Sequence, residues 1–169
     1  MKWALIIIGA LVLLIGVTAA IGAMLPRAHR ATRRARFRQT PEAIYAVIAG
    51  APDWRSDVKE SGRLPDKEGR KQWWEMSRGQ RITYELVEDV PPARRVTRIA
   101  DKSLPFGGSW TLEITPEAGG SALRITEDGE VYNVIFRFMS RFIFGYTGSI
   151  EGYLRDLGKK FGESAEIEA

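Results

Sequence analysis

The chain has 169 residues, which is enough for one domain and an appendage but too few for two independent hydrophobic cores. It has no cysteine, which excludes disulfides, thiolate metal sites and a cysteine nucleophile. Its 25 basic and 21 acidic residues give a net charge of +4, and the positive excess lies entirely within the first 38 residues.

An apolar segment begins the chain. Residues 4–25 carry no charge and are almost all Leu, Ile, Val, Ala or Gly. As a helix rising about 1.5 Å per residue they extend about 33 Å, enough to cross a hydrocarbon core of about 30 Å. A cleaved signal peptide has a shorter hydrophobic run behind a basic start, and here only Lys2 precedes the run. We interpret the segment as a transmembrane anchor. The alternatives are a signal peptide, for which Ala19, Ala20 and Ala23 offer a cleavage site, and a buried helix of a soluble protein.

An arginine-rich flank follows the apolar segment. Six arginines lie between residues 27 and 38, whereas Lys2 is the one basic side chain before the span. The positive-inside rule therefore predicts a single-pass membrane protein with a cytoplasmic C-terminal domain. Residues 39–169 hold 18 basic and 21 acidic residues, a net charge of about −3, so the folded part is not basic and we expect no nucleic-acid partner. The flank is attracted to anionic headgroups, which makes membrane lipids an expected partner.

The first elements after the flank are predicted to be a strand and a short helix. Residues 33–38 alternate between arginines and smaller or apolar side chains, as in a half-buried strand. Thr40 suits an N-cap, Pro41 suits the first helical position, and Gly50 ends the helical stripe. Residues 51–57 are predicted to be a turn or a second short helix.

Period-two segments separated by Pro, Gly and Asp follow, and their short spacing predicts antiparallel hairpins. The predicted strands are Val58–Arg63, Lys71–Ser77, Arg81–Glu88, Arg95–Asp101, Ser109–Thr115 and Ala122–Glu127. Residues 133–161 then carry apolar side chains at spacings of three and four, which predicts one long helix. The apolar face of the sheet is the surface available to this helix. The fold class is therefore α+β, with a curved antiparallel sheet wrapped on a long C-terminal helix.

This order of elements resembles the START-like or helix-grip superfamily, which includes polyketide cyclases and aromatase/cyclases, lipid-transfer domains and the Bet v 1 plant allergens. The resemblance covers nearly all of residues 32–161. Residues 39–54 (QTPEAIYAVIAGAPDW) resemble its first strand-to-helix junction. Residues 106–115 (FGGSWTLEIT) and 120–133 (GSALRITEDGEVYN) resemble bacterial members named for polyketide cyclase/dehydrase and lipid transport, the SRPBCC type. These motifs encode turns and core more than chemistry.

The apolar segment, the arginine flank and the extent of the resemblance together divide the chain into four expected segments. They are a transmembrane anchor over 1–25, a basic juxtamembrane tether over 26–31, a helix-grip domain over 32–162 and a flexible tail over 163–169. The resemblance itself implies an apolar ligand held between the sheet and the long helix, and no catalytic residue set common to the superfamily. The membrane segment is a departure from the soluble members.

Bulky side chains on the predicted sheet and helix are the candidates for the wall of such a ligand cavity. A well-filled core is the alternative explanation for each of them. The predicted ligand-binding residues are Trp74, Tyr84, Phe106, Trp110, Leu112, Ile125, Phe138, Phe142 and Tyr153.

The groups available for catalysis are few. The one histidine, His29, falls in the predicted tether, so we expect no histidine base in the domain, no catalytic triad and no metal site. The sequence has no phosphate-binding or dinucleotide-binding motif, and we expect no cofactor. The carboxylates on or beside the predicted strands are expected to be solvated. They are Glu75, Glu85, Glu113, Glu127 and Glu130. Glu130 is the one for which a catalytic role is hardest to dismiss.

Three functions remain open. The leading hypothesis is a membrane-tethered binding module for a hydrophobic or lipid-like molecule, which needs a cavity and no catalytic group. The second is a cyclase-type or dehydratase-type enzyme, which needs an inward polar pair deep in the cavity. The third is a protein-interaction domain whose cavity is filled by side chains. The ligand, any protein partner and the oligomeric state are not predicted.

The charge asymmetry makes a prediction about topology. A reporter fused after Ala169 should be active in the cytoplasm, because six arginines follow the span and one lysine precedes it. Paired reporters that are active on opposite sides of the membrane measure this. Activity of the reporter that works outside the cytoplasm would contradict the orientation.

Overall fold

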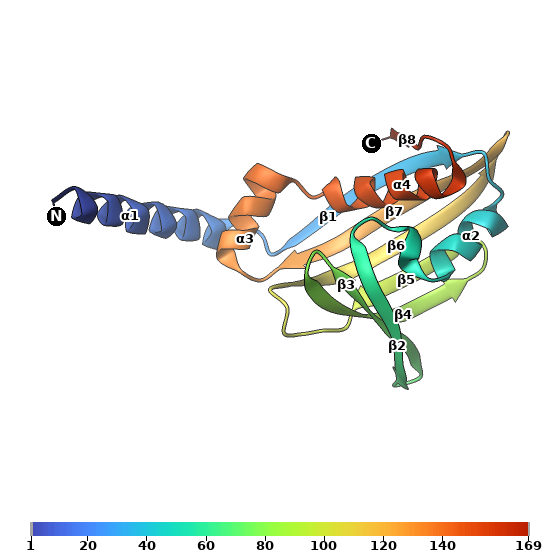
Figure 1. Cartoon of the computed structure of the whole chain (residues 1–169), viewed down its shortest axis with the longest axis horizontal. Helices are drawn as coiled ribbons and strands as arrows, with labels where there is room; N and C mark the ends of the chain where they lie inside the picture. Colours follow the sequence, from blue (N-terminus) through green and yellow to red (C-terminus); the bar gives the residue numbers. More distant parts are fainter. Residues whose placement is uncertain (1, 169) are drawn as a thin grey trace.

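An eight-stranded antiparallel sheet organises the folded part of the chain, in the order β2-β3-β4-β5-β6-β7-β1-β8 (Figure 1). This computed structural model describes residues 2–168. The strands are β1 (Ala28–Phe37), β2 (Val58–Lys67), β3 (Arg70–Ser77), β4 (Gln80–Val90), β5 (Arg94–Ile99), β6 (Phe106–Glu117), β7 (Gly120–Val131) and β8 (Glu166–Glu168). All six predicted strands between residues 58 and 127 are present, and most extend further than predicted.

Two short helical segments connect β1 to β2. Helix α2 (Pro41–Ala49) begins after Thr40, whose side chain accepts a hydrogen bond from the Ala43 amide at 3.3 Å. Pro41 occupies the first turn and Gly50 ends the helix, as the cap and stop signals predict. The 3-10 turn η1 (Pro52–Trp54) follows. Helix α2 lies at the end of the sheet far from the N-terminus (Figure 1).

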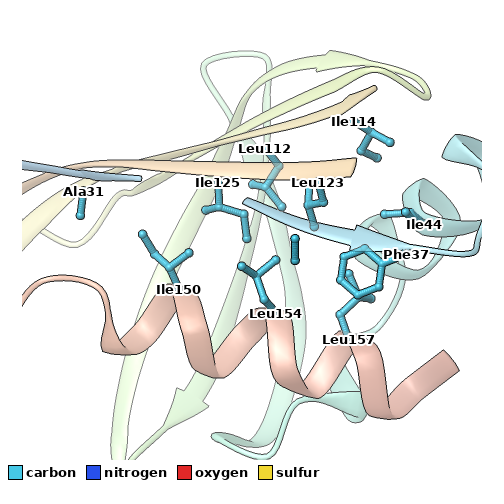
Figure 2. Close-up of a cluster of buried hydrophobic side chains, with 11 residues drawn as sticks. Ala31, Phe37, Ile44, Leu112, Ile114, Leu123, Ile125, Ile150, Leu154 and Leu157 are labelled. Carbon is cyan, nitrogen blue, oxygen red and sulfur yellow. The ribbon is translucent and has the colours of Figure 1, made fainter. Parts of the chain in front are cut away.

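Helix α4 (Gly148–Phe161) packs along the sheet and forms the hydrophobic core with it. Ile150, Leu154 and Leu157 point from this helix toward Leu123 and Ile125 of β7 (Figure 2), and all five side chains are fully buried. Burying a side chain of this size stabilises the fold by about 1.5–3 kcal/mol. The predicted packing of a terminal helix on a curved sheet is confirmed.

The C-terminal helix is interrupted, so the prediction of one helix over 133–161 is wrong. Helix α3 (Val134–Met139) continues into a π-helical turn, η2 (Ser140–Phe144), and ends at Gly145. Gly145 has φ 71°, a left-handed conformation that glycine adopts without strain and that cannot continue a helix. Helix α4 then starts in a new direction at Gly148. The apolar side chains of residues 133–161 therefore lie on two helical segments that face different surfaces.

The ends of the domain differ from the expected boundaries. Strand β1 begins at Ala28 and pairs with β7 from the register Ala28↔Glu130 onward, so most of the expected tether 26–31 is strand. The segment expected as a tail contains β8, which pairs with β1 through Arg34↔Glu168. An ion pair of 2.7 Å joins these two side chains. Residues 1 and 169 lie outside the described residues.

The apolar helix α1 (Lys2–Met24) is joined to the domain by a buried arginine. Arg137 of α3 is 4% exposed. Its Nη1 donates to the carbonyls of Gly22 and Leu25, both at 3.1 Å, and its Nε and Nη2 donate to Val131 and Tyr132 at 3.0 and 3.1 Å. The last carbonyls of a helix lack intrahelical partners and carry partial negative charge, so a guanidinium satisfies them. The helix and the domain therefore meet at a defined contact.

The backbones of α1 and α3 approach each other closely at Gly22. A Cβ added there would lie 2.0 Å from the carbonyl oxygen of Val134, whereas one added at Gly16 of the same helix would meet nothing within 4 Å. We therefore expect Gly22→Ala to destabilise the full chain by about 1–3 kcal/mol and Gly16→Ala to have no such effect. Each kcal/mol corresponds to a fall in Tm of roughly 2–4 °C for a chain of this size.

The measurement is thermal unfolding of both variants in detergent micelles, followed by near-ultraviolet circular dichroism. Equal Tm values for the two variants would show that α1 does not pack on α3.

Candidate functional site

A cavity of about 1660 Å³ lies on the inner face of the sheet, bounded by α2, η1, η2 and α4. It exceeds the roughly 300–1,000 Å³ of a pocket for a drug-sized ligand. Its wall is mixed, with aromatic and aliphatic side chains and a few groups of polar ones. The aromatic lining residues are Tyr45, Trp54, Trp73, Tyr84, Phe106, Trp110, Phe136, Phe144, Tyr146 and Tyr153.

Five of the nine predicted ligand-binding residues line this cavity. Tyr153 packs between two tryptophans, with ring centroids 4.9 Å from Trp54 and 5.6 Å from Trp110. Burial raises the pKa of the Tyr153 hydroxyl above its ordinary value, so it is a neutral group at physiological pH. That these side chains bind a ligand stays a prediction. The five residues are Tyr84, Phe106, Trp110, Leu112 and Tyr153.

The other four predicted residues are not among the lining side chains. Trp74 faces the opposite side of the sheet, where the Arg81 guanidinium lies 4.4 Å from its ring, and the neighbouring Trp73 faces the cavity instead. Adjacent strand residues point to opposite faces, so the choice between two consecutive tryptophans depends on register. Ile125 is fully buried beneath α4.

The break at Gly145 explains the remaining two residues, because it turns α3 and η2 away from the sheet. Phe138 and Phe142 pack on each other with ring centroids 5.0 Å apart. The sequence reasoning placed them opposite the sheet because it assumed a continuous helix.

A buried polar network lies in the cavity wall, and sequence reasoning missed it. Arg55 donates from Nη1 to Glu75 at 2.7 Å and from Nε and Nη2 to the two oxygens of Asp57 at 3.1 and 2.9 Å. Trp73 Nε1 donates to the other oxygen of Glu75 at 2.9 Å, and Ser77 donates to Asp57. Glu75 is 5% exposed, so the expectation that it is solvated is wrong. Both carboxylates accept charge-assisted hydrogen bonds.

Two charges of the network hold their ionised states. Burial alone would lower the pKa of the Arg55 guanidinium, but Glu75 and Asp57 together raise it above its ordinary value. Burial alone would raise the pKa of Asp57, but its hydrogen bonds from Arg55 and Ser77 lower it below the ordinary value. Arg55 and Asp57 are therefore an ionised pair, and the hydrogen bonds of the network are satisfied internally.

Glu85, also expected to be solvated, is buried on the outer face of the sheet. Arg98 Nε donates to it at 2.6 Å, and Arg70 lies 3.7 Å from the same oxygen. Alternation correctly placed it away from its apolar neighbours, but cross-strand arginines cover it. It takes no part in the cavity.

The histidine lies on β1 in the cavity wall and not in a tether, so the expectation that the domain contains no histidine is wrong. His29 lies on β1 and stacks on Tyr146 with ring centroids 4.0 Å apart. Its Nε2 is 3.4 Å from Glu127 Oε1. Gly129 leaves room for the ring, since an added Cβ would lie 2.3 Å from His29 Cε1. His29 shares the inner face of β1 with Ala31, so extending the alternation toward the N-terminus would have found it.

The His29–Glu127 pair differs from the Arg55 network in its hydrogen bonding. His29 Nδ1 and Glu127 Oε2 are buried and have no hydrogen-bond partner among the described residues. A buried polar atom without a partner is destabilised by about 1–3 kcal/mol. The pair is therefore one part of the wall where a hydrogen-bonding group of a guest would be complementary, and the Nε1 of Trp54, which is also buried without a partner, is another.

Comparisons with solved structures identify the fold. Norcoclaurine synthase from Thalictrum flavum superposes with a TM-score of 0.60 at 10% identity, over 80% of this chain and 87% of that one. The di-domain ARO/CYC StfQ of the steffimycin biosynthetic pathway gives 0.59 at 13% identity, over 80% of this chain and 52% of that one. A protein from Thermus thermophilus gives 0.58 at 19% identity, over 77% and 93%.

The predicted START-like helix-grip fold is thereby confirmed, on a chain that also carries a long apolar N-terminal helix. No protein-family model and no curated protein sequence matches the chain. At identities of 10–19% the likeness concerns the fold alone.

The Arg55 network makes a prediction about pH. Because the folded-state pKa of Asp57 lies below its ordinary value of 3.8, its stabilising effect is fully present above that value and is lost as the pH falls through the folded-state pKa. Asp57→Asn should therefore lower the free energy of unfolding by about 1–3 kcal/mol at neutral pH, and the difference from the natural chain should shrink under acid conditions.

Denaturant unfolding at neutral and acid pH measures both values. Asp66→Asn, which changes an exposed carboxylate on β2, is the matched control and should have no effect at either pH. A destabilisation by Asp57→Asn that does not change with pH would contradict the ion-pair explanation.

Proposed function

We propose that the protein is a membrane-tethered binding module for a hydrophobic or lipid-like small molecule, held between the sheet and the C-terminal helices. The observation that carries this proposal is the size of the cavity together with its wall of aromatic and aliphatic side chains. Apolar surface in contact with water is unfavourable by about 25 cal/mol per Å². A guest that covers the wall is therefore favoured, and the volume admits one larger than a typical drug.

The tethering role rests on α1 and its junction with the domain. Among the described residues, α1 is the one helix long and apolar enough to cross a membrane. A signal sequence near the N-terminus would meet the same criteria of length and hydropathy, but cleavage after Ala23 would remove the Gly22 carbonyl and leave Arg137 short of a partner. Cleavage after Ala20 would remove the helix that holds this carbonyl in place. A buried charge without its partners is strongly destabilised, so the junction supports a retained anchor.

Anchoring also suits the binding of a lipid-like guest. A domain beside the bilayer meets lipid-like molecules at high local concentration, so modest affinity is sufficient. With Nε2 of His29 donating to Glu127, the unpartnered atoms of this pair favour a hydrogen-donating group on an otherwise apolar guest, and the unpartnered Nε1 of Trp54 favours an accepting one. The third hypothesis, an interaction domain whose cavity is filled by side chains, is disfavoured by a cavity of about 1660 Å³.

A second candidate function is catalysis of the cyclase or dehydratase type, and the His29–Glu127 pair favours it. With Nε2 donating to Glu127, the Nδ1 lone pair of His29 becomes a general base that a carboxylate orients. Glu75 is a poorer base, because both of its oxygens already accept hydrogen bonds from Arg55 and Trp73.

The binding proposal predicts that filling the cavity excludes the guest. Thr97 of β5 lines the cavity, whereas Thr111 of β6 is half-buried elsewhere on the sheet. The natural chain and Thr111→Trp should carry an extractable apolar molecule and be stabilised by it. Thr97→Trp should lose most of that molecule and its stabilisation. Native mass spectrometry of the full chain released from detergent, organic extraction, and thermal shifts with fatty acids, quinones and polycyclic ketones measure this.

Retention of the same guest by Thr97→Trp and the natural chain would place the molecule outside the cavity. No extracted molecule and no stabilisation by any probe would contradict the binding function.

The catalytic candidate has its own test. The extracted molecules and the polycyclic ketones are incubated with the natural chain and with His29→Gln, and products are sought by mass spectrometry. Loss of water or ring closure with the natural chain, abolished in His29→Gln while binding persists, would establish an enzyme. Unchanged molecules in every incubation would leave binding as the function.

A further inference from the structure

Large apolar side chains are exposed together on α3 and η2. Phe136, Phe142, Ile143 and Phe144 are between 49% and 66% exposed. Scattered exposed apolar residues are ordinary, but a contiguous apolar patch on a folded domain marks a surface that contacts a partner or a membrane. The break at Gly145 produces this patch, because it separates η2 from the helix that packs on the sheet.

The patch has a fixed place relative to α1. Arg137 and Gly22 join α3 to the end of that helix through backbone carbonyls, as described above. Figure 1 shows α3 running across the end of α1, on the side of the domain from which α1 projects. A span that crosses the bilayer therefore places α3 and η2 at the membrane surface.

The wall of the cavity includes part of this patch, and we call this exposed edge of the cavity its mouth. Phe136 and Phe144 are exposed and also line the cavity, together with Ser140, Gly145 and Tyr146 of the adjoining segment. The exposed patch and the mouth of the cavity therefore share residues. His29, which stacks on Tyr146, lies just inside this mouth.

The charges beside the patch suit a headgroup layer. Arg141 is exposed within η2, and Arg27 is exposed directly after α1. Long basic side chains near a membrane extend to the headgroups while their neighbours bury apolar surface. Arg141 beside the exposed Phe142, Ile143 and Phe144 is the combination of basic and apolar side chains that interfacial segments have.

We infer that α3 and η2 dock on the lipid bilayer in the leaflet where α1 leaves it, with Phe142, Ile143 and Phe144 among the acyl chains, and that the mouth of the cavity faces the membrane. The docking rests on the proposed anchoring role of α1. A guest then passes between bilayer and cavity without crossing water. A second copy of the chain and another protein are the competing occupants of the patch.

The absence of cysteine makes the test direct, because a single introduced cysteine carries the only spin label. The full chain is reconstituted into vesicles of phosphatidylcholine and phosphatidylglycerol with a nitroxide at Ile143→Cys, Phe144→Cys or, as the reference in the span, Leu13→Cys. Val90→Cys is the matched control, since Val90 is an exposed apolar residue at the end of β4, beside the Asp89 that contacts α2. Collision rates with oxygen and with a water-soluble nickel complex are measured.

We expect the ratio of oxygen to nickel collisions at 143 and 144 to resemble that at 13 and to exceed that at 90 several-fold. A ratio at 143 and 144 equal to that at 90, with residue 13 in lipid, would overturn the docking and leave the anchor in place. A label at 13 that is exposed to nickel would overturn the anchor as well. Spin–spin broadening at 143 or 144, or shielding from both reagents, would assign the patch to a second copy or to another protein.

A photoactivatable fatty acid in the same vesicles tests the position of the mouth. Crosslinks are expected on Tyr146 and deeper on Trp110, and Phe144→Asp should reduce those on Trp110 several-fold while Val90→Asp does not. Equal labelling in both variants would overturn a mouth that faces the membrane. Absence of cavity labelling in every chain would contradict both that mouth and the binding of fatty acids, whereas the collision rates still decide the docking.

Discussion

Arg137 is a charged side chain in a place that water does not reach, and the arrangement of the molecule depends on how its charge is satisfied. A buried guanidinium without partners would be strongly destabilising. Its partners are carbonyl oxygens at the end of α1 and at the end of β7, which lie far apart in the sequence. The same hydrogen bonds that satisfy the arginine therefore join an apolar helix to a folded domain. These hydrogen bonds therefore also set the orientation of the domain relative to α1.

The cavity contains two kinds of polar group with different consequences. Around Arg55 every carboxylate already accepts hydrogen bonds within the protein. This network therefore stabilises the wall and has few free groups that could bind a guest. Around His29 two buried polar atoms, His29 Nδ1 and Glu127 Oε2, are without hydrogen-bond partners among the described residues. Unsatisfied buried groups are expected at functional positions and are too costly elsewhere. Trp54 Nε1 is a third buried atom of the wall without a partner. The hydrogen bonding thus distinguishes the Arg55 network, which supports the fold, from the groups that are free to bind a ligand.

The fold accounts for the cavity, and the sequence of this chain accounts for where it opens. A curved sheet with a helix packed along it leaves space toward one end, which side chains fill only in part. A helix that continued through Gly145 would lie along the sheet, with its aromatic residues against that space. The left-handed glycine redirects η2, so Phe142 and Phe144 are exposed instead of packing on the sheet. Gly145 thus changes which surface the apolar side chains of η2 face.

The sequence by itself determined the order of the elements, the caps of α2, the strands from 58 to 127 and the apolar helix α1, because alternation, capping and turn formation are local properties of the chain. Only the tertiary structure decided that Trp73 and not Trp74 faces the cavity, because that depends on the register between β3 and β4. It also decided that Glu75 is buried under Arg55, that His29 belongs to the sheet through its pairing with β7, and that α3 packs on α1. Each of these contacts joins residues distant in the sequence, and no local pattern encodes the partner.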